Sequence, residues 1–140
     1  MRGEFIAADR AARLASGWIE AWVRMDIDWL RRHLAPHFVH TSPFGRLEGR
    51  DFYLATVEPL ARKGVQALEI KQVIASEDQA AVWFENKTPK GVIPSCDWVH
   101  VEGDAITAIQ SFYDSAAVRA VLSDDEQSRL CGYGNPEGPV

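Results

Sequence analysis

The sequence predicts an α+β fold in which helices fill the first part of the chain and a curved, mostly antiparallel sheet fills the rest. Apolar residues recur at helical spacing in residues 7–24 and 50–63, whereas residues 65–113 show the period of two that is typical of half-buried strands. The last two strand patterns flank a Gly-containing turn at residues 102–104, which is the usual signal for a β-hairpin. Helices packed on one face of such a sheet enclose a pocket.

The first half of the chain carries three helix patterns and one strand pattern. Residues 7–24 place Trp18 and Trp22 on one apolar stripe. Asp26 is a good N-cap for a second, short helix, which should stop at the residue before Pro36, because proline disfavours helical geometry there. A strand over residues 37–42, a turn over residues 43–45 and a third helix over residues 50–63 complete this half.

The second half alternates almost without interruption. Ser123 and Glu126 have the spacing of a capping box, so a short helix should follow them. We expect one domain over residues 1–131 and a disordered tail over residues 132–140, which are rich in Gly and Pro. The remaining expected elements are strands over residues 65–74, 80–88, 92–101 and 105–113 and a helix over residues 115–122.

Composition and charge exclude several classes of partner. The chain has 140 residues, a net charge of −5 and a pI of about 5.3. Nucleic acids and anionic membranes require a basic face, so we expect neither as a partner. No segment has the apolar pattern of a signal peptide or the length of a membrane span, which makes a cytoplasmic location the expectation. Cys96 and Cys131 define no disulfide framework.

Asp97 is the residue that fits its strand least well. Asp is depleted in strands, yet Asp97 shares a face with Val99 and Val101. A carboxyl buried among them must be neutral or paired, and desolvation raises its pKa, so that it can give or take a proton. Ser111 and Tyr113 share one face of the next strand and should line the same pocket. The alternative is that Asp97 is a solvated or ion-paired residue on the outer face.

The histidines do not predict a metal site. His37 and His40 are three residues apart in a strand, so they point to opposite faces, and Pro36 interrupts the helical spacing between His33 and His37. We expect His40 on the outer face, unless the register of its strand slips by one residue. Cys96 has outward parity and no activating base, which argues against a thiolate nucleophile.

The outer face of the sheet predicts an interface. Trp83, Trp98 and Phe112 all have the parity opposite to the pocket. Three large aromatic side chains on an uncovered face form an apolar patch of the kind that is usually an interaction site. We expect a homodimer that forms through this face.

Two stretches resemble a known family. DIDWLRRHLAPHFVHTSP (residues 26–43) and EGDAITAIQSFYD (residues 102–114) are similar to parts of the nuclear-transport-factor-2-like superfamily, which includes SnoaL-like polyketide cyclases and ketosteroid isomerases. The resemblance covers roughly residues 8–122 and implies a cone-shaped fold and sheet-to-sheet dimers.

The resemblance also assigns roles to individual residues. Asp97 falls on the protonated oxyanion-hole aspartate of ketosteroid isomerase, and Trp18 on its oxyanion tyrosine. Ser42 falls on the general-base aspartate of that enzyme, and Ser111 on the catalytic aspartate of limonene epoxide hydrolases.

The sequence therefore predicts an acid–base enzyme of isomerase, lyase, dehydratase or cyclase type that needs no cofactor and acts on a small hydrophobic substrate, cyclic or aromatic. The alternative is a non-catalytic small-molecule-binding or dimerisation module of the same fold. The expected catalytic residues are Asp97, Tyr113 and Trp18. The expected substrate-binding residues are Trp22, Thr41, Ser42, Phe84, Asn86, Thr88, Val99, Ile109 and Ser111.

Overall fold

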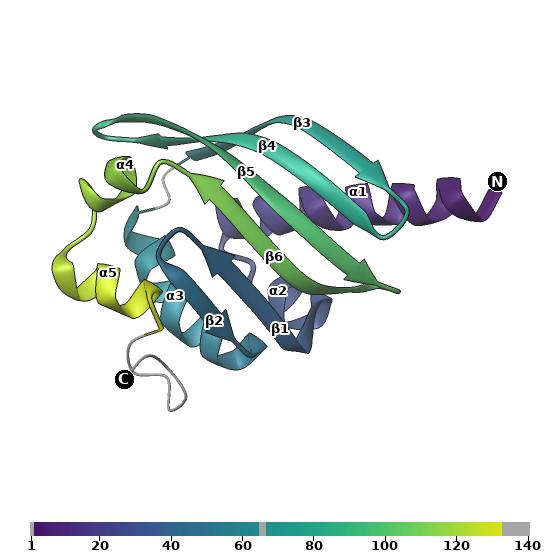
Figure 1. Cartoon of the computed structure of the whole chain (residues 1–140), viewed down its shortest axis with the longest axis horizontal. Coiled ribbons are helices and arrows are strands. Elements are labelled where there is room, and N and C mark those ends of the chain that lie inside the picture. Colours follow the sequence, from purple (N-terminus) through teal and green to yellow (C-terminus); the bar gives the residue numbers. More distant parts are fainter. Residues whose placement is uncertain (1, 65–66, 133–140) are drawn as a thin grey trace.

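The computed structural model describes residues 2–64 and 67–132, with the side chains of the first helix described from residue 7 onward. A six-stranded curved sheet forms one layer, and three helices pack on one of its faces (Figure 1). The elements in chain order are α1 (Arg2–Arg24), α2 (Ile27–His33), β1 (Leu34–Ser42), β2 (Gly45–Glu48), α3 (Arg50–Gly64), β3 (Ala67–Ser76), β4 (Gln79–Thr88), β5 (Gly91–Glu102), β6 (Ala105–Tyr113), α4 (Ser115–Arg119) and α5 (Asp124–Leu130).

The sheet has the strand order β2-β1-β6-β5-β4-β3. All neighbouring strands are antiparallel except β1 and β6, which are parallel. The predicted α+β class and mostly antiparallel sheet are therefore confirmed. The long strands β3 to β6 start and end within three residues of their predicted limits, because an unbroken alternation and turn residues mark both of their ends.

The segment between α2 and α3 differs from the prediction. The Asp26 side chain accepts a hydrogen bond from the Trp29 backbone N–H at 3.0 Å, as expected of an N-cap. The helix nevertheless ends at His33, and β1 begins directly at Leu34. Pro36 is accommodated because the pairing of β1 with β6 shifts register between Leu34 and Val39, where no regular ladder needs its missing N–H.

Strand β2 was not predicted at all. It has four residues, too few to show a period, and its first residue lies in the predicted turn over residues 43–45. The helix predicted over residues 115–122 ends at Arg119, whereas the capping box of Ser123 and Glu126 forms as expected. The tail predicted to be disordered lies, except for Gly132, outside the described residues.

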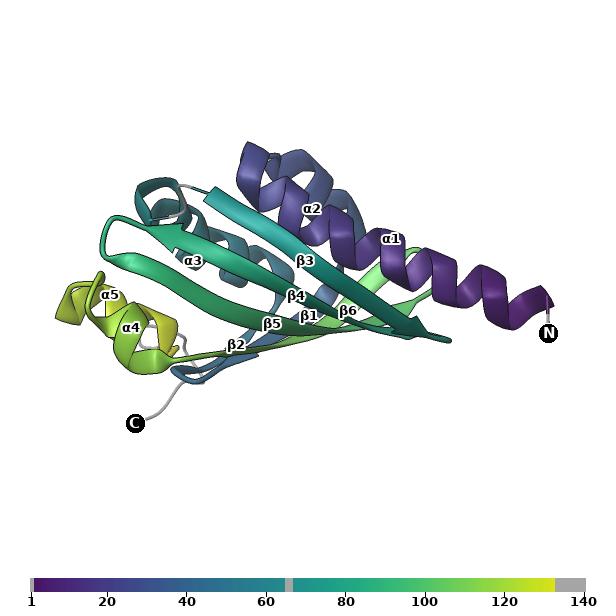
Figure 2. The same ribbon diagram turned by 90° about the horizontal axis from the view of Figure 1, so that it is seen from above.

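The core lies between the inner face of the sheet and helices α1, α2 and α3, and no described helix covers the outer face (Figure 2). Trp18 is at its centre, with ring centroids of Trp22, Phe38 and Tyr53 within about 6 Å. Burial of each such side chain contributes roughly 1.5–3 kcal/mol. Figure 2 also shows α4 and α5 at one end of the sheet, beside the β4–β5 turn. Within the described part of the chain, none of the helices is both long and apolar enough to cross a membrane.

A candidate acid–base site in the pocket

A cavity of about 220 Å³ lies between the inner face of the sheet and helices α1 and α3. Its walls come from alternate residues of β4, β5 and β6, whose side chains point inward with the period of two. Apolar side chains of the α4–α5 segment form the outer rim. These rim residues are Val118, Val121, Leu122 and Leu130.

Asp97 is the buried carboxyl of this cavity, with 4% of its surface exposed. It lies in β5 between Val82 of β4 and Ser111 of β6. The Trp18 indole N–H donates to Asp97 Oδ2 at 2.8 Å. The other oxygen, Oδ1, is buried and accepts no hydrogen bond from any described residue. Burial raises the pKa of Asp97 to about 6, against the opposing effects of the Trp18 N–H and the Ser111 hydroxyl.

His40 also faces the cavity, so the expectation that it lies on the outer face is wrong. Its Nε2 lies 2.9 Å from Ser111 Oγ, and its ring centroid lies 5.0 Å from that of Tyr53. Burial lowers the pKa of His40 to about 4, so the ring is neutral at pH 7. Ser111 is also the cross-strand neighbour of Asp97, and its hydroxyl is close enough to lower the pKa of that carboxyl.

The position of His40 was available from the sequence. Ser42 was expected to face the pocket, and a residue two positions away in a strand shares the same face. The structure places both in the cavity lining, and Thr41 between them is exposed. The pairing of β1 with β2 from Val39 to Ser42 keeps this alternation regular.

Tyr53 of α3 was missed by the sequence analysis. Its side chain is 2% exposed and lines the cavity. Burial, with a contribution from the Asp97 charge, raises the pKa of Tyr53 well above its ordinary value, so its phenol stays protonated. The sequence does contain a signal for it: Tyr53, Val57 and Ala61 recur at spacings of four, and all three line the cavity.

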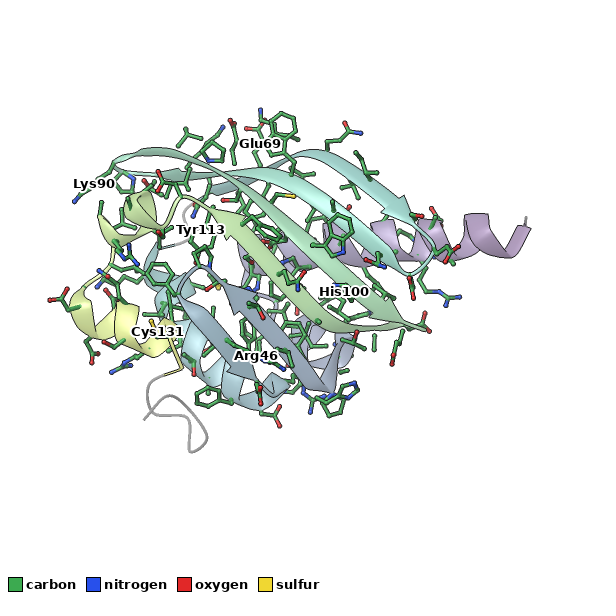
Figure 3. All side chains as sticks on the ribbon, in the orientation of Figure 1. Arg46, Glu69, Lys90, His100, Tyr113 and Cys131 are labelled. Atoms are coloured by element: carbon green, nitrogen blue, oxygen red, sulfur yellow. The ribbon has the colours of Figure 1, made fainter. Side chains whose placement is uncertain are left out.

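Tyr113 lies at the end of β6, on the side of the molecule where α4 and α5 lie (Figure 3). It lines the cavity, and partial burial raises the pKa of its phenol, with Ser42 close enough to oppose that effect. The Ser42 hydroxyl accepts a hydrogen bond from the Phe44 backbone N–H at 3.1 Å. The phenol of Tyr113 is thus a second protonated donor, nearer the outer end.

Most of the predicted site residues meet in this cavity, and three do not. Val99 and Ile109 are fully buried in the core and do not line the cavity, and Thr41 is exposed on the other face of β1. The residues that do line it are Trp18, Trp22, Ser42, Phe84, Asn86, Thr88, Asp97, Ser111 and Tyr113.

The lining carries little charge. Its ionisable side chains are His40, Tyr53, Asp97 and Tyr113, and no Lys or Arg of the described chain belongs to it. Across residues 2–64 and 67–132, no group of three or more His, Cys, Asp or Glu side chains is placed to hold a metal ion.

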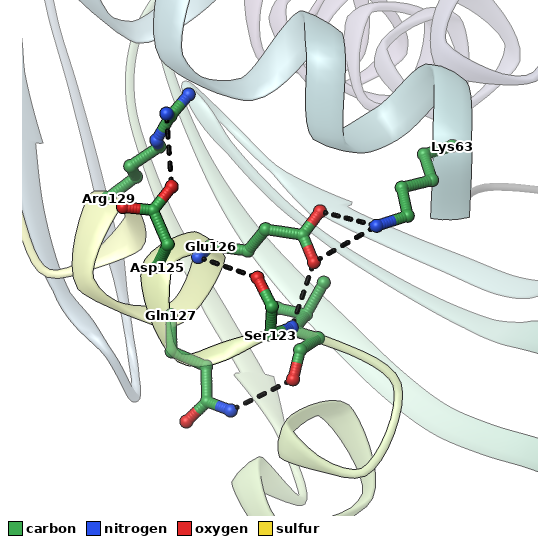
Figure 4. A network of polar contacts seen from close by, with 7 residues as sticks. Lys63, Ser123, Asp125, Glu126, Gln127 and Arg129 are labelled. Atoms are coloured by element: carbon green, nitrogen blue, oxygen red, sulfur yellow. Dashed lines mark hydrogen bonds and ion pairs between the residues drawn. The ribbon is translucent and has the colours of Figure 1, made fainter.

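The outer rim is held by polar contacts. The Ser123 hydroxyl accepts from the Glu126 backbone N–H at 3.2 Å, and the Glu126 carboxylate pairs with Lys63 of α3 at 3.2 Å (Figure 4). Lys90, in the β4–β5 turn, donates to the Ala120 carbonyl at 2.7 Å. These contacts connect the α4–α5 segment to α3 on one side and to the sheet on the other.

Residues 15–109 match the model of a family described as SnoaL-like domain. A protein from Kribbella flavida DSM 17836 is 25% identical with a TM-score of 0.71, over 79% of this chain and 91% of that chain. A candidate SnoaL-like polyketide cyclase from Jannaschia sp. CCS1 is 14% identical with a TM-score of 0.70, over 84% and 94% of the two chains. A candidate ketosteroid isomerase from Kribbella flavida DSM 17836 is 16% identical with a TM-score of 0.67, over 76% and 79%.

These likenesses confirm the resemblance inferred from the sequence. The two at 14% and 16% identity show a shared fold and nothing more. A comparison with curated proteins finds no match.

Proposed function

Because this chain belongs to the SnoaL-like domain family, we propose that it is an acid–base enzyme that moves a proton on a small hydrophobic substrate without a cofactor. Isomerase, lyase, dehydratase and cyclase chemistry all fit this description. Proteins that share this fold include a candidate polyketide cyclase and a candidate ketosteroid isomerase, so the fold is compatible with such chemistry.

The observation that carries the proposal is the Asp97 carboxyl. It is buried, one of its oxygens is held by Trp18, and the other has no partner among the described residues. A general base is most effective when its pKa lies near the working pH, and the pKa of Asp97 is raised to about 6. Asp97 is therefore ionised at neutral pH, yet it can hold a proton taken from a substrate.

Two phenols supply the stabilisation of negative charge. Tyr53 and Tyr113 both have raised pKa values and stay protonated, so each can donate a hydrogen bond to an oxygen on which charge develops. Trp18 was expected in this role, but its N–H is bonded to Asp97. In this arrangement Trp18 is a positioning residue, which orients the carboxyl and favours its ionised form.

Ser111 and His40 form a hydrogen-bonded pair next to the Asp97 carboxyl. When the proton of neutral His40 is on Nε2, the ring donates to the Ser111 oxygen. With the proton on Nδ1, His40 instead accepts from Ser111. Ser111 can thus act as either acceptor or donor towards His40.

The walls indicate the kind of substrate. Trp18, Trp22, Tyr53 and Phe84 present aromatic surface to the cavity, and its volume of about 220 Å³ suits a small ring system. An aromatic or cyclic molecule buries the most apolar surface against such walls.

The proposal can be tested before the natural substrate is known. 5-Nitrobenzisoxazole loses its C3 proton to a base while its N–O bond breaks, and the product is a coloured cyanophenolate. We expect the rate to rise with pH through an inflection near 6, the pKa of Asp97. Asp97→Asn should lower the rate by about 10²–10⁴-fold.

A carboxyl carbon NMR titration provides the control, because it needs no substrate. If Asp97 titrates near its ordinary value of 3.8, or if Asp97→Asn leaves the proton-abstraction rate unchanged, the carboxyl is not a desolvated base and the proposal is wrong.

A non-catalytic binding module is the second candidate. It is favoured by the serines at positions 42 and 111, where the resembling enzymes carry catalytic carboxylates. Tight binding of small aromatic molecules without any proton abstraction from 5-nitrobenzisoxazole would identify this case.

We propose that the partner on the outer face is a second copy of this chain. Trp83, Trp98 and Phe112 remain 51%, 40% and 57% exposed on this face. Cys96 lies directly between Trp83 and Phe112 in the cross-strand register, so the aromatic side chains form a continuous patch. A symmetric pairing of two such faces buries all of them.

A further inference from the structure

Two buried polar oxygens in the cavity have no partner among the described residues: Asp97 Oδ1 and Asn86 Oδ1. Buried polar atoms are nearly always hydrogen-bonded, because an unpaired one costs free energy. Both residues line the same cavity, so one bound molecule can satisfy both atoms.

The two atoms lie at different depths. Asp97 is the cross-strand neighbour of Val82, and Asn86 is four residues further along β4, opposite Ile93. At the rise of a β-strand this places the two positions roughly 13 Å apart along the sheet. Asp97 is therefore at the inner end of the cavity, beside Trp18, and Asn86 is towards the rim.

The wall between these two positions is mainly apolar. Phe84 and Ile93 face the cavity from the sheet, and Trp22 and Val57 face it from α1 and α3. Ser95 also lies between them, but its hydroxyl already donates to the Ile93 carbonyl. A ligand that reaches both polar atoms must carry its apolar surface in the middle.

The cavity offers no compensation to a negative charge. Its described lining contains no Lys or Arg, and His40 is neutral at pH 7. A carboxylate or phosphate would have to lose its hydration beside the ionised Asp97, which is costly without a paired cation.

From this arrangement we infer that the ligand is an uncharged, elongated molecule with an apolar ring system in the middle and a hydroxyl group at each end, since each unpaired oxygen needs a hydrogen-bond donor. The inner group meets Asp97 and the outer group meets Asn86. A hydroxyl suits Asn86 in either orientation of its amide, because a hydroxyl both donates and accepts. The inference rests on the proposed site and deepens it, since it specifies what the site admits.

Calorimetric titration with three rigid probes tests this inference. The probes are 4-phenylphenol, with one hydroxyl, 4,4′-dihydroxybiphenyl, with a hydroxyl at each end, and biphenyl-4-carboxylate. We expect the diol to bind about tenfold more tightly than the monophenol, because it satisfies one more buried group. The carboxylate should not bind measurably.

The variant Asn86→Leu isolates the outer contact. The diol and the monophenol should bind to Asn86→Leu with equal affinity, because the second hydroxyl of the diol has lost its partner. Lys87→Leu places the same side chain one residue further on, on the outer face of β4, and should keep the tenfold preference.

Equal binding of the diol and the monophenol to the unchanged protein overturns the inference, and this comparison requires no variant to fold. The inference is also overturned if biphenyl-4-carboxylate, or biphenyl-4-ylmethylamine as a cationic probe, binds more tightly than the diol. The outcome is separable from that of the proposed function, because proton abstraction by Asp97 does not depend on Asn86.

Discussion

The Trp18 indole nitrogen lies 2.8 Å from Asp97 Oδ2, and this hydrogen bond joins α1 to β5 across 79 residues of chain. Both groups are buried, so the bond is shielded from competing water. An N–H that donates to a carboxylate favours its ionised form. Trp18 therefore keeps the pKa of Asp97 from rising further in this apolar site.

Trp18→Phe should raise the pKa of Asp97 above its present value of about 6, because the ring remains while the donor is lost. Carboxyl carbon NMR measures this directly. Trp22→Phe is the matched control, since Trp22 lies on the same helix and lines the same cavity without a hydrogen bond to Asp97. An unchanged Asp97 pKa in Trp18→Phe would show that the hydrogen bond has no effect on the carboxyl.

The pH dependence of stability should reveal two opposing groups. Asp97 has its pKa raised from 3.8 to about 6, so its contribution to the free energy of unfolding is lost as pH rises through that window. His40 has its pKa lowered from 6.5 to about 4, so its contribution is lost as pH falls through that window. Each contribution is on the order of 3 kcal/mol, and in the unchanged protein the two nearly cancel.

Replacing one of the two residues at a time should reveal how the other makes the free energy of unfolding depend on pH. In Asp97→Asn the free energy of unfolding should rise between pH 4 and 6.5, and in His40→Gln it should fall between pH 4 and 6. Urea denaturation at a series of pH values measures both. Glu20→Gln removes an exposed carboxylate and should keep the original profile. If the free energy of unfolding depended on pH in the same way in the unchanged protein and in all three variants, the opposing pKa shifts of Asp97 and His40 would be contradicted.

Gly17→Ala should destabilise the protein by roughly 1–3 kcal/mol. A Cβ at Gly17 would clash with Trp29 Cζ2, and the Trp29 ring is held by stacking on His33, with 4.0 Å between the ring centroids. In a Trp29→Ala background the sign should reverse, because Ala is favoured over Gly in a helix by about 1 kcal/mol. Urea denaturation of the four proteins in this cycle measures both effects. Destabilisation of the same size in both backgrounds would refute a clash with Trp29.

Trp98→Glu should convert the proposed dimer to monomers in sedimentation experiments, because it places a charge within the outer apolar patch. Val23→Glu is the matched control, since Val23 is an exposed apolar residue of α1 and lies on no part of the sheet. A monomeric unchanged protein at tens of micromolar, roughly the range in which standard-sized interfaces form, would contradict the proposal.

The faces of β5 and β6 were predictable because their alternation is uninterrupted. Asp97, Ser111 and Tyr113 all face the cavity, as the period of two indicates. In β1 the alternation excludes one of the two adjacent residues expected in the pocket, since Thr41 and Ser42 point to opposite faces and only Ser42 lines the cavity. Because residues two positions apart in a strand share a face, Ser42 alone predicts that His40 also faces the pocket.

Other features of the site lie beyond a pattern of residue types. The hydrogen bond between Trp18 and Asp97 depends on how α1 packs across β3 and β4, which is a tertiary relationship. The pairing of Ser111 with His40 requires β1 and β6 to be parallel neighbours, although 71 residues separate the two side chains. Local periodicity contains no information about either.

The dependence of the cavity on distant segments has a consequence during synthesis. α1 leaves the ribosome before the sheet, and its apolar stripe, which includes Trp18, Ile19 and Trp22, is covered by α3 and by strands that are made later. Until β5 and β6 have emerged, a nascent chain therefore exposes this stripe to water and to other chains. A translating chain that is released before residue 113 should bind chaperones and no ligand, because the wall of the pocket stays open until β6 pairs with β1.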